Sequence, residues 1–338
     1  MRLGLIGTGR IGTMHARTLL NVDGVTELRI TDALPERASR LAEDLRAEGW
    51  AADAADTEDD LYSGGVDAVV ITAATHAHAA LIHGALDREV PVFCEKPVAL
   101  DVPGTRGVVE HDEAVRTPLQ IGFQRRYDAG YRAARDAIRS GRLGWLHTLR
   151  AVTGDQGPPP AEYIATSGGL FRDCSIHDFD VLRWITGREV VSVCARGANR
   201  GAAFFAEGDD VDTGAALLEF DDGLLATVTA TRYNGAGHDV RLEVCGSQDA
   251  MFVGNDDRAP LPSAEEGVTW PSAEPYRTFL ERFRSAYVAE LTEFVEVAAG
   301  RSPNPCTAAE ALEALYVAEA CDLSRRTGRP VTIEEVRA

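Results

Sequence analysis

The sequence predicts an α/β protein with two domains, the first built on a parallel sheet and the second an α+β domain with a large, mostly antiparallel open sheet. Three observations support this fold class. The chain has 338 residues, more than one small domain needs. Short apolar runs alternate with amphipathic helical runs over residues 1–122, a pattern typical of βαβ units. After residue 190, strand-like runs follow one another with short turns between them, which favours antiparallel pairing.

The first domain is expected over residues 1–122. The spacing of its apolar residues predicts strands at 3–6, 27–32, 66–72, 90–94 and 118–122, and helices at 11–20, 36–47, 76–87 and 105–116. His78 and His83, inside the third of these helices, are interpreted as ordinary helix-face residues.

The second domain is expected over residues 123–338. Its pattern predicts a helix at 131–140, a strand at 145–153, a loop around the three prolines at 158–160, and a helix at 176–186. Strands are expected across 190–253, followed by a polar loop at 254–274. Helices at about 279–299 and 308–327 close the chain, and the last can pack back on the first domain.

Charge and composition exclude several classes of protein. The 34 basic and 53 acidic residues give a formal net charge of −19, which argues against nucleic-acid binding. No run of 18 apolar residues predicts a membrane span, and the N-terminus does not resemble a signal peptide, so we expect a cytoplasmic protein. The six cysteines form no CxxC pair, which predicts reduced, packed thiols and no metal site.

A glycine-rich turn follows the first predicted strand. Residues 7–12, Gly-Thr-Gly-Arg-Ile-Gly, match GxGxxG and open the first predicted helix, which is the context that this motif needs. The first glycine permits the tight turn, the second lets a pyrophosphate approach the backbone, and the third lets helix and strand pack closely. We therefore expect a Rossmann domain, with cofactor contacts from Gly7, Gly9, Arg10, Ile11 and Gly12.

Asp32 lies 20 residues after Gly12, at the end of the second predicted strand. A carboxylate at this place can hydrogen-bond the adenosine ribose and repels a 2′-phosphate, which favours NAD over NADP. Arg37 in the next helix could weaken that preference, and a turn or helix-capping role for Asp32 is the alternative.

Lys96 is the only lysine in a chain with 33 arginines. It follows a predicted strand, at the carboxyl end where open α/β sheets bind ligands. A lysine, unlike an arginine, has a tunable pKa, so a catalytic role is one reading and chance survival of one lysine is the other.

Asp173 and His177 are four residues apart, after a Gly-Gly pair at 168–169. If this stretch is helical, both side chains share a face, and the carboxylate can orient the imidazole as a general base. An ordinary packed histidine is the alternative.

Four segments resemble one enzyme family. GLIGTGRIGTMHA, FCEKP, GFQRRYD (residues 122–128) and SGGLFRDCSIHDFDVLRW together resemble the Gfo/Idh/MocA oxidoreductases, and within them the inositol 2-dehydrogenases, over essentially the whole chain. The resemblance implies that Lys96 hydrogen-bonds the reacting hydroxyl, that His177 takes its proton, and that Asp173 pairs with His177. The carbinol hydrogen would leave as hydride to the nicotinamide of NAD.

The resemblance also implies further contacts. Cofactor contacts are expected from Thr72, Ala73, Ala74, His76, Glu95, Lys96 and Gln124. Substrate contacts are expected from Lys96, Gln124, Asp155, Gln156, Asp173, His177, Asp180 and His238. Arg126 is interpreted as a surface salt-bridge partner, and for Arg125 a place near nicotinamide and substrate stays open beside that role.

Two departures from the inositol dehydrogenases leave the substrate open. His238 replaces a frequent tyrosine, and the loop at 153–157 reads Thr-Gly-Asp-Gln-Gly. The leading hypothesis is oxidation of myo-inositol or a close cyclitol by a homotetramer. A sugar or aminocyclitol-pathway dehydrogenase on the same scaffold is the second, and a nicotinamide-binding regulator without turnover is the third.

Overall fold

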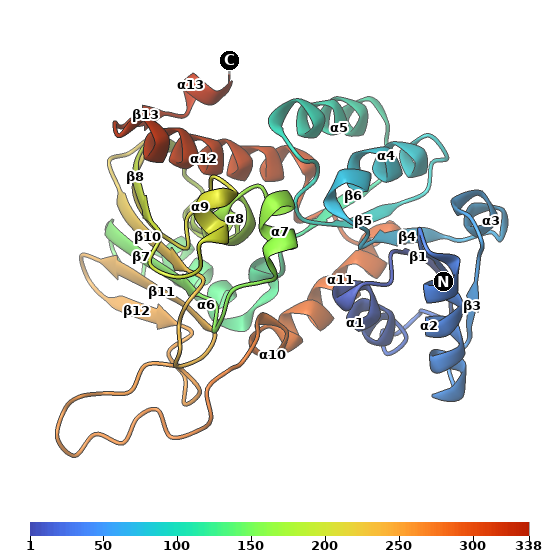
Figure 1. The fold of residues 1–338 in the computed structure, drawn as a ribbon, viewed down its shortest axis with the longest axis horizontal. Helices are drawn as coiled ribbons and strands as arrows, with labels where there is room; N and C mark the ends of the chain where they lie inside the picture. The colour runs from blue at the N-terminus through green and yellow to red at the C-terminus, as the bar shows by residue number, and fades with distance from the viewer. Residues whose placement is uncertain (338) are drawn as a thin grey trace. The chain divides into compact units, whose positions relative to one another are not determined.

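The computed structural model describes residues 1–337, which form two compact units (Figure 1). Unit 1 comprises residues 1–124 and 285–312, and unit 2 comprises residues 125–284 and the chain from residue 313 onward. None of the helices in the described residues combines the length and the apolar character that crossing a bilayer requires.

Unit 1 is built on a six-stranded parallel sheet with the order β3-β2-β1-β4-β5-β6, the strand order of the Rossmann fold. Its strands are β1 (Arg2–Ile6), β2 (Glu27–Thr31), β3 (Ala52–Ala54), β4 (Ala68–Ile71), β5 (Val92–Glu95) and β6 (Leu119–Gly122). Its helices are α1 (Arg10–Leu19), α2 (Pro35–Ala47), α3 (Glu58–Ser63), α4 (Thr75–Leu86), α5 (Val102–Ala114) and α11 (Arg284–Ala298).

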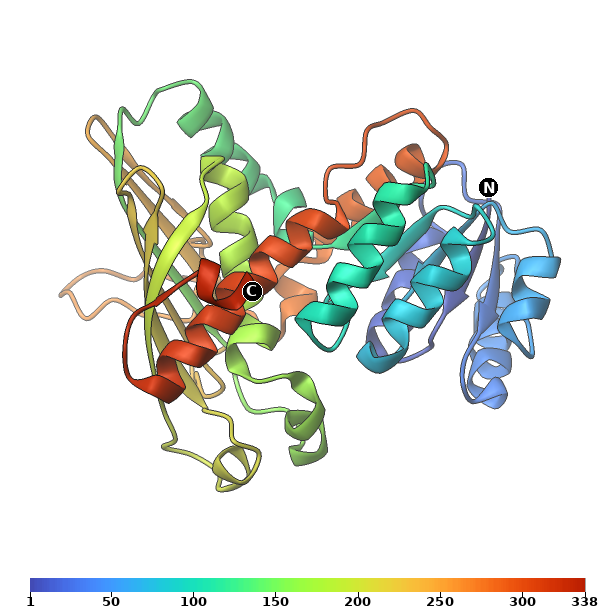
Figure 2. The same cartoon turned by 90° about the horizontal axis from the view of Figure 1, so that it is seen from above.

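Helices cover both faces of this sheet. Helices α4 and α5 lie side by side on one face, and α1, α2 and α11 lie on the other (Figures 1 and 2). Apolar side chains of α1, α2 and α11 pack with those of β1 and β2 in one core, to which the late helix α11 contributes Leu291, Phe294 and Val295. β4 is apolar throughout, and β1 is apolar after Arg2, because both of their faces are covered.

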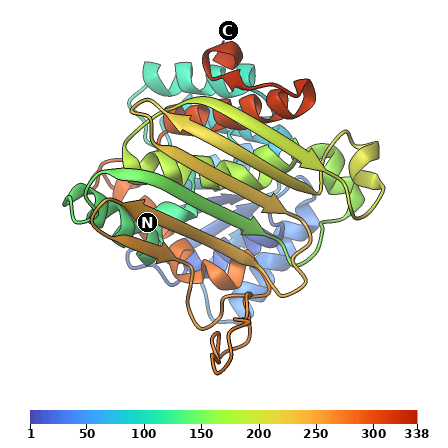
Figure 3. The same cartoon turned by 90° about the vertical axis from the view of Figure 1, so that its left-hand side faces the viewer.

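Unit 2 is built on a seven-stranded sheet with the order β12-β11-β7-β10-β9-β8-β13 (Figure 3). Its strands are β7 (Leu146–Gly154), β8 (Val190–Ala198), β9 (Thr213–Phe220), β10 (Leu225–Thr231), β11 (Asp239–Gly246), β12 (Ala250–Val253) and β13 (Val331–Thr332). Only the pair β7 and β10 is parallel, so the expected mostly antiparallel sheet is confirmed. In β9 and β10 buried and exposed residues alternate, because one face of the sheet packs on helices and the other is open.

The helical elements of unit 2 vary in length and type. They are α6 (Ala129–Arg139), α7 (Ala161–Ser167), α8 (Ile176–Thr186), α9 (Phe204–Glu207), α10 (Phe279–Arg282), α12 (Ala308–Thr327, in unit 2 from residue 313) and α13 (Glu334–Arg337). A 3-10 turn, η1 (Gln124–Tyr127), precedes α6, and a π-helical turn, η2 (Phe171–Ser175), leads directly into α8.

Most expected elements are confirmed within a few residues, and the misses are short. The pattern did not predict β3, α3, α7, α9, β13 or α13, each of seven residues or fewer. The helix expected at about 279–299 is divided into α10 and α11 at Phe283, whose side chain is buried. A fully buried aromatic side chain at this break fixes the chain through packing, which apolar spacing alone cannot reveal.

Candidate functional site

The glycine-rich turn between β1 and α1 has the shape of a phosphate cradle. Gly7 has a φ of +101°, and a Cβ built on it would lie 2.6 Å from the backbone nitrogen of Ala73. A Cβ on Gly12 would lie 2.0 Å from the carbonyl oxygen of Gly7, so both positions require glycine. No described atom lies within 4 Å of a Cβ built on Gly9, which leaves open space over the first turn of α1, where Arg10 and Ile11 follow. Free N–H groups at this helix N-terminus suit the phosphates of a dinucleotide.

Asp32 is held at the end of β2 by the same turn. Its Oδ2 accepts hydrogen bonds from the backbone N–H and the hydroxyl of Thr8, both at 2.7 Å, and its Oδ1 accepts one from the N–H of Leu34 at 3.0 Å. Burial alone would raise the pKa of Asp32, but these hydrogen bonds outweigh it, so the pKa lies below its usual range. Asp32 is therefore a fixed anion beside the glycine turn, which fits a ribose of NAD.

The loop after β4 contacts the glycine turn through its first residue. The hydroxyl of Thr72 donates to the carbonyl oxygen of Gly7 at 2.7 Å. Ala73 and Ala74 follow, and His76 is exposed in the first turn of α4. The four residues predicted here therefore lie within one short segment, residues 72–76, whose first residue contacts the glycine turn.

His78 corrects one interpretation made from the sequence. It is 2% exposed, not an ordinary residue of a helix face. Its Nε2 lies 2.9 Å from the carbonyl oxygen of Ala73 and its Nδ1 lies 2.7 Å from that of Pro97. The ring thus links the loop after β4 to the turn that carries Lys96. His83 is partly buried, and its Nδ1 lies 2.7 Å from Nδ1 of His111.

Lys96 lies directly after β5, as the strand prediction implied. It is half-buried, and its peptide bond to Pro97 is cis. The carboxylate of the preceding residue, Glu95, contacts the fully buried His15 of α1, with 2.7 Å between Glu95 Oε1 and His15 Nε2. Gln124, two residues after β6, is 4% exposed.

The acid–base candidates of unit 2 lie where the helix geometry changes. Gly168 and Gly169 have φ values of +81° and +94° and lead from α7 to the π-helical turn. Asp173 lies inside that turn, and His177 lies in the first turn of α8. A π-helical turn is rare and frequently marks a functional site. The stretch is helical, but Asp173 lies in its π-helical part, so the α-helical i, i+4 geometry applies only from residue 176 onward.

Arg232 joins the two carboxylates at this place. It follows β10, is 3% exposed, and donates from Nη1 to Asp155 Oδ2 at 2.9 Å and from Nη2 to Asp173 Oδ2 at 2.6 Å. The hydroxyl of Tyr163 donates to Asp173 Oδ1 at 2.9 Å. His238 Nδ1 lies 3.4 Å from Asp155 Oδ1. Four of these residues, Asp155, Asp173, Arg232 and His238, form what we call the carboxylate bridge, with Tyr163 at its edge. Gln156, the next residue after Asp155, is half-buried in the following bend.

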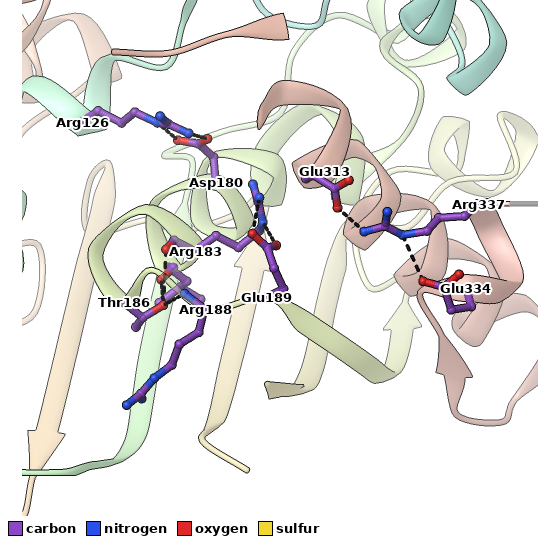
Figure 4. A network of polar contacts seen from close by, with 10 residues as sticks. Arg126, Asp180, Arg183, Thr186, Arg188, Glu189, Glu313, Glu334 and Arg337 are labelled. Carbon is purple, nitrogen blue, oxygen red and sulfur yellow. Dashed lines mark hydrogen bonds and ion pairs between the residues drawn. The ribbon is translucent and has the colours of Figure 1, made fainter. Parts of the chain in front are cut away.

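Arg125 and Arg126 are salt-bridge partners, but the surface position expected for Arg126, and left as one alternative for Arg125, is wrong. Both are 2% exposed. Arg125 pairs with Asp178 and also donates to the hydroxyl of Thr153. Arg126 donates to both carboxylate oxygens of Asp180, which is fully buried (Figure 4). Charged groups this deep are stable only as pairs, and apolar spacing gives no sign of which pairs form.

Four residues with contacts to the predicted site were not found from the sequence: Thr8, His15, Tyr163 and Arg232. Thr8 lies inside the glycine motif and could have been included from its position alone. Tyr163 and Arg232 lie 10 and 59 residues from Asp173, and no local pattern connects them.

Two family models match this chain. The model described as "Oxidoreductase family, NAD-binding Rossmann fold" matches residues 1–123, and the one described as "GFO/IDH/MocA C-terminal domain" matches residues 131–251. Together they cover most of the chain.

Relatives with known names match over nearly their whole length. A myo-inositol dehydrogenase of Streptomyces leeuwenhoekii is 36% identical over 97% of this chain and 98% of its own. The scyllo-inositol 2-dehydrogenase (NAD(+)) of Bacillus subtilis is 35% identical over 100% of this chain and 98% of its own. The structure of scyllo-inositol dehydrogenase from Lactobacillus casei with bound NAD(H) and scyllo-inositol superimposes with a TM-score of 0.86 at 27% identity, covering 99% of each chain.

Proposed function

Because this chain belongs to the Gfo/Idh/MocA oxidoreductases, with an NAD-binding Rossmann domain, we propose that it oxidises a secondary hydroxyl of myo-inositol or a close cyclitol to a ketone. The observation that carries the proposal is that this chain contains both a dinucleotide cradle, in unit 1, and a buried bridge that holds the carboxylate of Asp173, in unit 2. The names of the relatives, which act on inositols, support the substrate class.

NAD is the cofactor that unit 1 fits. The glycine turn would hold its pyrophosphate, with Gly7, Gly9, Arg10, Ile11 and Gly12 in contact, and the Asp32 anion would bind its ribose and repel a 2′-phosphate. We propose that Thr72, Ala73, Ala74, His76, Glu95 and Gln124 make the remaining contacts. When bound, NAD supplies the hydride acceptor, the C4 atom of its nicotinamide.

Three side chains carry the chemistry in this proposal. His177 takes the hydroxyl proton as general base, and Asp173 orients its imidazole. Lys96 donates a hydrogen bond to the same oxygen and stabilises the negative charge that develops on it. Asp155, Gln156, Asp180 and His238 would recognise the other hydroxyls of the ring.

The substrate is tested by initial rates of NAD and NADP reduction with a panel of inositols, glucose and xylose at alkaline pH. We expect rapid NAD reduction with myo-inositol or scyllo-inositol and none with Lys96→Ala, which keeps its NADH affinity. Unchanged turnover in Lys96→Ala would remove that residue from the chemistry. Turnover with glucose or xylose, but with none of the inositols, would exclude a cyclitol as the substrate.

A sugar or aminocyclitol is the second candidate substrate, and one observation favours it. His238 is buried against Asp155, and a histidine at this place differs in size and charge from the frequent tyrosine of inositol dehydrogenases. Activity with sugars alone in the same panel supports this candidate.

We also propose a homotetramer in the cytoplasm. None of the six cysteines, all of which the structure describes, forms a disulfide, which fits a reducing compartment. Leu217 and Leu225 are 46% and 43% exposed on the open face of the sheet of unit 2, and a second subunit could cover them. Light scattering coupled to size-exclusion chromatography gives the oligomeric state, and a monomer would contradict this assembly.

A further inference from the structure

We propose that Arg232 is a positioning residue of the reaction, which fixes the separation of Asp155 and Asp173 and holds the Asp173 carboxylate in one orientation. This inference rests on the proposed function, because it gives Arg232 its role through His177. It concerns a residue outside every motif that predicted the site.

The backbone brings the three residues together. β7 and β10 are parallel neighbours with Gly154 opposite Thr231, so Asp155 and Arg232 each follow the end of adjacent strands. The N–H of Asp155 donates to the carbonyl oxygen of Thr231 at 2.9 Å, which extends this pairing by one step. Asp173 reaches the same place from the π-helical turn.

The guanidinium uses its two terminal nitrogens on two different carboxylates. Nη1 is 2.9 Å from Asp155 and Nη2 is 2.6 Å from Asp173, and the arginine side chain is 4% exposed. The nitrogens of a guanidinium have a fixed planar spacing, so this bridge sets the distance between the two carboxylates. A lysine, which is one point charge on a flexible stem, cannot reproduce it.

Each carboxylate also has a second partner. The Oδ1 atom of Asp173, which Arg232 does not contact, accepts a hydrogen bond from the Tyr163 hydroxyl. The Oδ1 atom of Asp155 faces the imidazole of His238. Asp173 is thus held at both oxygens, which restricts its rotation about the side-chain bonds. The titratable or charged groups close to Arg232 are Asp155, Asp173, Cys174 and Asp210, with Tyr163 and His238 beyond the two bridged carboxylates.

The position of Arg232 also affects the charge near the base. In the proposed mechanism, where Asp173 orients the imidazole, an unscreened Asp173 anion would favour the imidazolium form of His177. The nearby guanidinium offsets part of that negative charge. Without it, His177 would gain its proton at higher pH, and its neutral form would be scarcer in the acidic half of the working range.

The test compares Arg232→Gln, Arg232→Lys and Tyr163→Phe with the wild type. The control is Arg183→Gln, because Arg183 is also a buried arginine of unit 2 and binds both carboxylate oxygens of Glu189 (Figure 4). The first readout needs no turnover: the titration of the His177 ring by NMR, assigned with His177→Gln. The second is the pH profile of kcat/KM with the inositol that the wild type oxidises.

We expect Arg232→Gln to raise the titration midpoint of His177 by about one pH unit. It should move the acidic limb of kcat/KM by the same amount and lower kcat/KM about 100-fold. Arg232→Lys should restore the midpoint but not the rate, because the charge returns without the bridge. Tyr163→Phe, on an exposed part of α7, should fold normally and lower kcat/KM about tenfold.

Arg183→Gln should leave both readouts unchanged even if its thermal midpoint falls. Either of two results would reduce Arg232 to a structural residue. One is a His177 titration midpoint that does not change in Arg232→Gln. The other is a kcat/KM of Tyr163→Phe within twofold of the wild type. Two results together would overturn the proposed function and leave the bridge in place. The wild type would oxidise no inositol, while Arg232→Gln would still shift the titration midpoint of His177. If Arg232→Gln does not fold, Tyr163→Phe and Arg232→Lys decide the outcome.

Discussion

The imidazole Nδ1 of His78 lies 2.7 Å from the carbonyl oxygen of Pro97, the residue after Lys96. The opposite nitrogen of the same ring faces the carbonyl oxygen of Ala73. One buried side chain on α4 therefore links the two segments of unit 1 to which we assign nicotinamide-side contacts, the loop after β4 and the turn after β5. Carbonyl oxygens only accept, so each contact is a hydrogen bond when the facing nitrogen carries a proton.

Replacing His78 with phenylalanine should weaken cofactor binding. The change leaves two carbonyl oxygens without their ring partner and loosens both loops. We expect about tenfold weaker NADH binding, or about 1.4 kcal/mol, measured by nucleotide fluorescence. His83→Phe is the matched control on the same helix and should bind NADH as the wild type does. Equal affinities for both variants would show that the link does not shape the cofactor loops.

Alanine substitutions at two glycines of the turn should have different effects, one on cofactor binding and the other on the stability of the fold. The backbone of Gly9 has a φ of −64°, which alanine adopts, and its Cβ would point into open space. Gly9→Ala should therefore keep the wild-type melting temperature but bind NADH at least tenfold more weakly, since the methyl group occupies the approach of the pyrophosphate. Gly12→Ala should instead lose roughly 3 kcal/mol of stability, because its Cβ would collide with the Gly7 carbonyl. Calorimetry and NADH titration measure the two effects, and equal melting temperatures for both variants would contradict this division.

Asp155 should give the protein a pH-dependent part of its stability. Burial alone would raise the pKa of Asp155, but the hydrogen bond from His238 and the charge of Arg232 lower it below its usual range. A carboxyl group with a lowered pKa in the folded state contributes stability above its unfolded pKa of about 4 and loses it as the pH falls through the folded value.

The variant Asp155→Asn tests that contribution. We expect it to unfold about 2 kcal/mol more easily than the wild type at pH 7, because Arg232 and His238 lose an ionised partner. The difference should shrink as the pH falls from about 4 through the lowered pKa of the folded state, below which the wild-type carboxyl group is also neutral. Urea unfolding at several pH values measures it, and a difference that grows toward low pH would have the wrong sign.

Asp180 can be assigned to structure or to substrate by one variant. Both of its oxygens accept from Arg126, so Asp180→Asn should destabilise the fold by about 3 kcal/mol. A substrate contact would in addition raise KM about tenfold at a temperature where the variant remains folded. Steady-state kinetics separates the two roles, and an unchanged KM would withdraw Asp180 from the substrate site.

The sequence was sufficient to predict the elements that depend on residues close to one another along the chain. Apolar spacing predicted the strands of unit 1, and the glycine pattern correctly placed the turn between β1 and α1, because each depends on neighbouring residues. Lys96 was correctly placed after β5 for the same reason.

Contacts between distant residues were beyond that reasoning. Arg232 and Asp173 meet only because β7 and β10 pair in parallel and the π-helical turn lies over their ends. Arg126 and Asp180 are 54 residues apart, and an arginine looks the same in sequence whether it is exposed or buried in an ion pair. His78 was misjudged because its partners are backbone oxygens, which every residue has.

The most direct test of the central claim is to follow one atom. The wild type would be incubated with NAD and a myo-inositol or scyllo-inositol that carries deuterium on every ring carbon, and the NADH formed would be analysed by mass spectrometry. We predict one deuterium per molecule of NADH, at C4 of the nicotinamide, together with the inosose ketone and a slower rate than with unlabelled substrate. NADH without deuterium, or no NADH with either inositol, would contradict the assignment of this chain as a cyclitol dehydrogenase.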